Sequence, residues 1–160
     1  MLRVQFIHGL EGSPQGSKAQ FLARHFDART PAMDTSDFEV CVRLQADFIR
    51  SFKPEVLVGS SFGGAVALRL LRDGVWRGPT LLLAQAGIKL GAACKLPEGV
   101  RVCLVHGRRD DIVDPADSRK LALTGTRGLV RLEEVDDGHR LQSLVSSSRL
   151  AELVRELAPQ

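Results

Sequence analysis

Ser61 lies in a sequence context that could support nucleophilic chemistry. The run Gly59-Ser60-Ser61-Phe62-Gly63 has the form G-x-S-x-G, follows an apolar segment and opens an apolar helical pattern. A strand–turn–helix of this form holds a serine on a sharp, strained turn, which requires nearly side-chain-free residues two positions before and after it. Glycines occupy those positions around Ser61, whereas Val58 and Phe62 occupy them around Ser60. We therefore expect Ser61 to be the nucleophile; the alternative is an ordinary Gly-Ser turn that caps a helix.

A serine hydroxyl is a weak nucleophile and needs a neighbouring base, which a carboxylate orients. When such a turn joins a strand to a helix, the order along the chain is serine, acid, histidine. Two histidines follow Ser61, at positions 106 and 139. Only Asp73 and Glu98 lie between Ser61 and His106, whereas His139 follows several acids in a polar turn. We expect His139 to be the base; the alternative is a surface turn histidine.

The acid is expected just after the penultimate strand, where three aspartates follow His106-Gly107. Asp114 directly precedes Pro115, and an Asp-Pro pair is typical of a helix start, so Asp114 is better explained as a helix cap. The residues alone leave Asp110 and Asp111 both open. Whichever of the two is not used belongs to a solvated, charged turn.

Charge that develops on a substrate oxygen needs backbone amides aimed at it. One donor is expected to be the amide of Phe62, at the positive end of its helix. The second is expected in the loop His8–Pro14, whose glycines let the backbone turn inward, and Leu10 is the predicted donor. We expect His8 to shape this loop by hydrogen bonding and not to act as the base. A second His-Gly pair, His106-Gly107, also ends a strand, so the pair alone does not indicate a base.

The elements that must position these residues alternate between β-rich runs and helical patterns. Strands are expected at Val4–Ile7, Glu55–Gly59, Thr80–Ala84, Val100–His106 and Leu129–Val135. Helices are expected from Ser36 to the residue before Pro54, over Phe62–Asp73, from Asp114 to Gly125 and from about Arg140 to Leu157. The first begins with Ser36 and Glu39 as a capping box. This alternation predicts an α/β fold with a mainly parallel sheet and helices on both faces.

Length and composition predict one domain over residues 1–160 and exclude several other classes of protein. The chain is 44% hydrophobic and 26% charged, without a linker or a second composition regime. Its longest apolar runs, such as Ala65–Leu68, are far shorter than the ~20 residues of a membrane helix. The net charge of +3 is spread along the chain without a Lys/Arg run, so no nucleic-acid surface is expected.

The three cysteines indicate a reduced, cytoplasmic protein. Cys41, Cys94 and Cys103 form no C-x-x-C pair, and the N-terminus lacks the pattern of a signal peptide. Cys41 and Cys103 lie in apolar patterns and are expected in the core. The acids after His106 show no H-E-x-x-H or EF-hand spacing, so no metal site is expected.

Several motifs, in this order along the chain, resemble the α/β-hydrolase superfamily. They are His8-Gly9, Gly59-Ser60-Ser61-Phe62-Gly63-Gly64, His106-Gly107-x-x-Asp110-x-x-Val113 and Gly138-His139. The loop from His8 to Ala19 resembles more particularly the small bacterial YqiA-like esterases.

This resemblance implies a compact, lid-less α/β-hydrolase fold. It also implies a cofactor-independent serine esterase or thioesterase that acts on a small-molecule acyl substrate. Its triad would be Ser61, Asp110 and His139, which favours Asp110 over Asp111. A peptidase or lyase with the same triad, or a binding module without turnover, stays open because a fold does not determine a substrate.

The stretch between Ala84 and Glu98 is too short to hold a cap domain over Ser61. We therefore expect an open, shallow site whose specificity is set by the first loop and by the segment near Gln85. Arg108 and Arg109 lie beside the predicted acid, which leads us to expect a preference for anionic substrates.

Overall fold

The computed structural model describes residues 1–160 and contains a six-stranded sheet in the order β2-β1-β3-β4-β5-β6. Every neighbouring pair of strands is parallel. The strands are β1 (Arg3–Ile7), β2 (Asp27–Arg29), β3 (Val56–Ser60), β4 (Thr80–Leu83), β5 (Val102–Gly107) and β6 (Val130–Val135). The helices are α1 (Ser17–His25), α2 (Phe38–Phe52), α3 (Phe62–Arg72), α4 (Pro115–Ala122), α5 (Gln142–Ser146) and α6 (Arg149–Leu157). The predicted α/β fold with a parallel sheet is confirmed.

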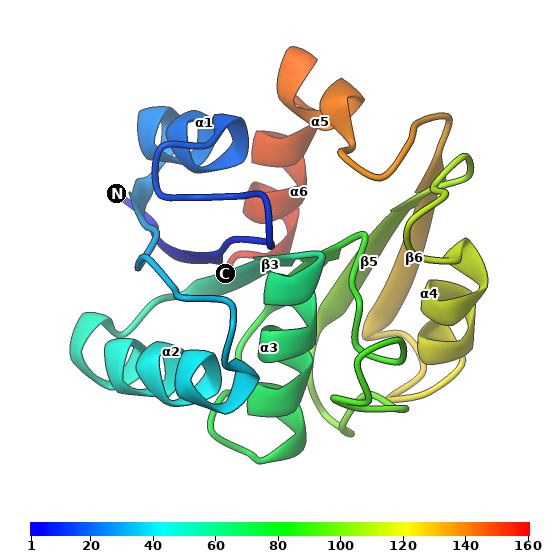
Figure 1. Cartoon of the computed structure of the whole chain (residues 1–160), viewed down its shortest axis with the longest axis horizontal. Helices are drawn as coiled ribbons and strands as arrows, with labels where there is room; N and C mark the ends of the chain where they lie inside the picture. Colours follow the sequence, from blue (N-terminus) through cyan, green and yellow to red (C-terminus); the bar gives the residue numbers. More distant parts are fainter.

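Helices cover both faces of the sheet, as the sequence predicted (Figure 1). On one face, α1 and α6 pack over strand residues that include Val58. On the other, α2, α3 and α4 pack over residues that include Leu57. Successive strand residues point to opposite faces, so a central strand needs apolar side chains at every position. None of the helices is both long enough and apolar enough to span a membrane.

Two of the three cysteines belong to these cores, as expected. Cys103 on β5 belongs to the core under α1 and α6, and Cys41 on α2 belongs to the core on the other face of the sheet. Both are 1% exposed, whereas Cys94 is exposed. Burial raises the pKa of both the Cys41 and the Cys103 thiol, which keeps them in the protonated, unreactive form.

The sequence analysis missed two elements, α1 and β2. Helix α1 begins after Gly16 without a side-chain cap and has no acidic residue in its first turn, so its start carries no signal. Strand β2 reads Asp-Ala-Arg and is an edge strand that pairs only with β1. Its strand conformation comes from pairing with β1, which local sequence does not reveal.

The predicted capping box at the start of α2 is wrong. Asp37 is the N-cap, and its Oδ1 accepts from the Val40 amide at 3.2 Å. The Ser36 hydroxyl instead donates to Asp34 Oδ1 at 2.7 Å, and Glu39 pairs with Arg69 at 2.7 Å. Asp34 thus holds the Ser36 hydroxyl, and the cap lies one residue further along the chain.

The predicted C-terminal helix is two helices, α5 and α6. The backbone of Ser147 is extended between them, with φ −122° and ψ −177°. Its hydroxyl donates to the Ser143 carbonyl at 2.7 Å and accepts from the Arg149 amide at 3.2 Å. Serine hydroxyls of this kind compete with the helical backbone ladder and end it. Helix α4 starts at the predicted Asp114 cap but ends at Ala122, before Gly125.

The position of the α2 cap can be tested with two neighbouring substitutions. Asp37→Ala removes the acceptor for the helical amide and is expected to lower the free energy of unfolding by about 1 kcal/mol. For a chain of this size, that corresponds to a fall in Tm of about 2–4 °C. Ser36→Ala, the matched control, is expected to change stability by less than about 0.5 kcal/mol. Thermal unfolding of both variants decides, and a larger loss from Ser36→Ala would contradict the assignment.

Candidate active site

Ser61 occupies a strained turn between β3 and α3. Its φ of +56° and ψ of −114° are rare for a residue other than glycine. A Cβ on Gly59 would lie 2.6 Å from the carbonyl oxygen of Gly63, and a Cβ on Gly63 would overlap the carbonyl of Ile7. The turn therefore excludes side chains at both glycines, which is the constraint that distinguished Ser61 from Ser60 in the sequence.

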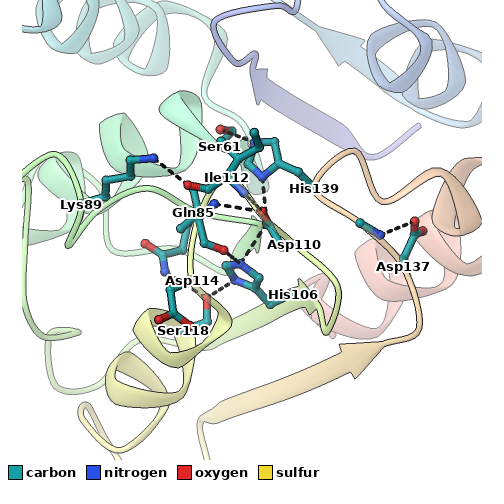
Figure 2. A network of polar contacts seen from close by, with 12 residues as sticks. Ser61, Gln85, Lys89, His106, Asp110, Ile112, Asp114, Ser118, Asp137 and His139 are labelled. Atoms are coloured by element: carbon teal, nitrogen blue, oxygen red, sulfur yellow. Dashed lines mark hydrogen bonds and ion pairs between the residues drawn. The ribbon is translucent and has the colours of Figure 1, made fainter.

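Ser61, His139 and Asp110 form a continuous hydrogen-bonded chain (Figure 2). Ser61 Oγ lies 2.9 Å from His139 Nε2, and His139 Nδ1 lies 2.8 Å from Asp110 Oδ2. An ionised carboxylate only accepts hydrogen bonds, so the imidazole proton is on Nδ1. Nε2 is then free to accept from the serine hydroxyl. The structure thus brings together the three residues that the sequence analysis selected.

The other sequence candidates do not belong to this hydrogen-bonded chain. Asp111 is exposed and makes no hydrogen bond to the chain, while Asp114 caps α4 by accepting from the Ala116 amide at 2.9 Å. His8 Nδ1 donates to the Gly9 carbonyl at 2.8 Å, and its Nε2 accepts from the Met33 amide at 3.1 Å. His8 therefore holds the first loop in place, as expected.

The Asp110 carboxylate is buried and fully engaged. Burial opposes its ionisation, but hydrogen bonds from His139 and from the Val113 and Ile112 amides outweigh that effect and lower the pKa of Asp110. Both amides donate to Oδ1 at 2.9 Å, which leaves Oδ2 for the imidazole of His139. A lowered pKa keeps this group an acceptor at neutral pH.

The loop that carries His139 is fixed by residues the sequence analysis missed. Asp137 accepts from the Gly138 amide and from the amide and hydroxyl of Ser143, at 2.7–2.8 Å. Burial opposes ionisation of Asp137, but these hydrogen bonds lower its pKa. From α1, Lys18 Nζ donates to the Arg140 carbonyl at 2.7 Å, and burial lowers the pKa of this amine. Lys18 lies in the segment from His8 to Ala19. The family resemblance of that segment was the only indication in the sequence that Lys18 has a role.

A cleft of about 680 Å³ opens beside Ser61 and His139 at the carboxyl edge of the sheet. The first loop and the His139 loop form most of its wall. Leu10 lines the cleft, and its amide donates to no group of the chain. Phe62 is the first residue of α3, so its amide has no partner within the helix. Both predicted amide donors are thus unoccupied by the chain.

Two expectations about the cleft need correction. Gln85 is fully buried and does not line the cleft, because its side chain bonds to Ser118 and Gly87 inside the protein. Arg108 and Arg109 also lie outside it, and Arg109 pairs with Asp136 at 2.8 Å. No helix or strand is inserted between β4 and β5. The first loop does line the cleft, as expected.

Comparison with known proteins gave matches to solved structures alone; no family model and no curated protein matches the chain. A proposed hydrolase of the α/β superfamily from Xanthomonas campestris is 22% identical, with a TM-score of 0.73 over 98% of this chain and 100% of the other. Mouse alpha/beta hydrolase domain-containing protein 10 is 15% identical, with a TM-score of 0.75 over 98% and 90%. A monoacylglycerol lipase from Paleococcus ferrophilus is 13% identical, with a TM-score of 0.74 over 96% and 94%.

The chain has the α/β-hydrolase fold. In this fold the nucleophile follows a central strand, and the acid and the histidine follow later strands in that order. In this chain, Ser61 follows β3, Asp110 follows β5 and His139 follows β6. The three residues therefore have the same order along the chain and lie at the same edge of the sheet.

The close approach at Gly107 can be tested by adding a methyl group. A Cβ there would overlap the Asp137 carbonyl and lie 2.6 Å from the Gly138 carbonyl, so Gly107→Ala must displace the His139 loop. We expect it to destabilise the protein by about 1–3 kcal/mol in urea unfolding. In the control Gly138→Ala, the added Cβ meets nothing within 4 Å, so little change is expected. Equal stability of the two variants would contradict the predicted clash.

The lowered pKa of Asp110 predicts how stability depends on pH. Between the folded and unfolded pKa values the unfolded chain binds more protons, so the free energy of unfolding falls as the pH drops below about 4. Asp110→Asn removes this contribution and should lose less stability between pH 7 and pH 3 than the wild type. Asp111→Asn, at an exposed carboxylate without partners, should follow the wild type. Parallel curves for Asp110→Asn and wild type in urea unfolding would refute this.

Proposed function

We propose that the protein is a serine hydrolase that cleaves carboxylic esters or thioesters through an acyl-enzyme on Ser61. The observation that carries the proposal is the hydrogen-bonded chain from Ser61 through His139 to Asp110, on a strained turn beside the cleft. Structural neighbours described as an esterase domain and as a monoacylglycerol lipase support hydrolysis as the reaction class.

In the first half-reaction, Ser61 Oγ attacks the substrate carbonyl while His139 Nε2 takes the hydroxyl proton. The amides of Phe62 and Leu10 donate to the oxyanion that forms, and each such donor lowers the barrier by about 3–4 kcal/mol. His139 then gives its proton to the leaving alcohol or thiol as the carbon–oxygen or carbon–sulfur bond breaks. The acyl group stays bound to Ser61.

In the second half-reaction, water attacks the acyl-serine and gives a proton to His139. Collapse of the tetrahedral intermediate releases the carboxylic acid, and the proton returns to Ser61 Oγ. Asp110 accepts from His139 Nδ1 throughout, which holds the imidazole in the productive tautomer and stabilises its cationic form.

The lining of the cleft favours a short acyl group. Only four of its twenty lining residues are hydrophobic. A long acyl chain would gain little from such a wall, because its binding depends on burying apolar surface. The first loop forms much of the wall. Its sequence from His8 to Ala19 also supports grouping this chain with the small YqiA-like esterases.

Hydrolysis of p-nitrophenyl esters tests the proposal. We expect the wild type to cleave acetate and butyrate esters faster than palmitate, and Ser61→Ala to lower kcat by about 10⁴–10⁶-fold while the protein stays folded. Ser60→Ala, the neighbouring serine, should retain activity within about tenfold. A fluorophosphonate should label the wild type once per chain and Ser61→Ala not at all.

Two results would refute the proposal. One is equal activity of the wild type and Ser61→Ala. The other is a wild type that cleaves no ester or thioester and takes no fluorophosphonate label, which would indicate a binding module. Cleavage of peptides in place of esters would keep the triad and change the substrate class.

A further inference from the structure

A buried polar network lies behind Asp110, on the side away from Ser61 (Figure 2). His106 Nε2 is 3.1 Å from Asp110 Oδ2 and 3.0 Å from the Val113 carbonyl oxygen. His106 Nδ1 is 2.6 Å from Ser118 Oγ, which accepts from Gln85 Nε2 at 2.9 Å. The side chains of Gln85, His106 and Ser118 are 0% exposed. The network is therefore shielded from water and directly contacts the proposed catalytic acid.

The donors in this network can be assigned from their partners. The Val113 carbonyl only accepts, so His106 Nε2 carries a proton and donates it to that carbonyl. The same Nε2–H group lies 3.1 Å from Asp110 Oδ2. Nδ1 then accepts from the Ser118 hydroxyl, because a proton there would leave that hydroxyl hydrogen without an acceptor. Gln85 Oε1 in turn accepts from the Gly87 amide at 2.7 Å. Each of these groups has a partner, and the donors run from Gln85 through Ser118 and His106 to the loop that carries Asp110.

We propose that His106, oriented by Ser118 and Gln85, is a positioning residue that fixes the Asp110 carboxylate against His139. This inference rests on the proposed function. His106 acts on the carboxylate in two ways: it holds the carbonyl of Val113, whose amide donates to Oδ1, and its Nε2–H group lies beside Oδ2.

A second partner for the carboxylate matters because His139 changes its charge twice in each turnover. His106 does not take part in that proton transfer, so it keeps Oδ2 in place in both charge states. The positive end of its Nε2–H dipole, 3.1 Å from Oδ2, also stabilises the carboxylate charge, which limits how strongly Asp110 favours the protonated form of His139. A buried histidine that only filled the core would have neither effect.

The test compares two substitutions at His106. His106→Leu removes the donor at similar volume, whereas His106→Gln keeps an amide N–H within reach of Asp110. For His106→Leu we expect kcat to fall by about tenfold to a hundredfold at nearly constant KM, as for a slightly misplaced reacting group. We also expect the acidic limb of the pH profile of kcat/KM to move to higher pH. His106→Gln should largely restore both quantities.

Two further variants separate positioning from simple stability. Gln45 on α2 has an equally buried side-chain amide, whose Oε1 accepts from Gln5 Nε2 on β1, far from the network. Gln45→Leu removes this amide. It should lower stability and leave the acidic limb unchanged. Ser118→Ala removes the hydroxyl that donates to His106 Nδ1, and it should move the acidic limb in the same direction as His106→Leu. If His106→Leu does not fold, Ser118→Ala takes its place in the test.

The charged groups around the two imidazoles are the same in all four variants. Lys18, Asp111, Asp137 and Arg140 border the cleft beside His139, and Glu134 on β6 pairs in register with His106. A displaced limb therefore reports the substitution itself.

A readout without substrate keeps this inference separate from the proposed function. The chain has four histidines, so their imidazole nitrogens can be assigned by nuclear magnetic resonance. At neutral pH we expect His106 to be protonated at Nε2 alone, and the Nδ1 proton signal of His139 to shift in His106→Leu and to return in His106→Gln. If the wild type cleaves no ester, the proposed function fails while these signals still decide the positioning role.

The positioning role is overturned by any of three results. The first is a His106→Leu variant with wild-type kcat and an unmoved acidic limb. The second is a fall in kcat without movement of the limb or of the His139 signal, which indicates a structural role only. The third is a His106→Gln variant that behaves like His106→Leu.

Discussion

The close approach of backbone to backbone at the β3–α3 turn is the constraint on which the rest of the site depends. Ser61 can hold its strained conformation only because Gly59 and Gly63 let α3 start directly against the ends of β1 and β3. The strain is held by the sheet, since the Ser61 amide donates to the Leu83 carbonyl at 2.9 Å and its carbonyl accepts from the Ala86 amide at 3.0 Å. A rigid turn of this kind places a hydroxyl without further adjustment during reaction.

The two His-Gly pairs show how the same solution serves two neighbouring loops. Each glycine lies close to the site: a Cβ on Gly107 would collide with the carbonyls of the His139 loop, and a Cβ on Gly9 would be only 3.2 Å from the Ser60 carbonyl oxygen. Each histidine is buried and bonds the loop that follows its strand. The repeated pair therefore identifies the loops that need fixing, whereas the chemistry belongs to residues farther along each loop.

Sequence reasoning went as far as local constraints allow. Glycine spacing selected Ser61, chain order selected His139, and apolar runs located five of the six strands within two residues. Asp110 and Asp111 have the same chemistry, and only the direction of the chain after Gly107 makes one buried and the other exposed. Resemblance could separate them, but spacing could not. The polar edge strand β2 and the role of Gln85 depend on partners distant in sequence, so no local pattern reveals them.

Burial of Gln85 explains why a short β4–β5 connection can still contribute to the site. The connection does not reach the cleft, yet it bonds to α4 at Ser118 and to the acid loop at Ile112. Gln85 holds Ser118 behind His106, and Lys89 donates to the Ile112 carbonyl at 2.6 Å (Figure 2). The Ile112 amide, on the same residue, is one of the donors to Asp110. A loop held by bonds from β5, α4 and the β4–β5 connection has little freedom to move. The carboxylate can therefore be buried and ionised at once, because its donors are fixed before any substrate binds.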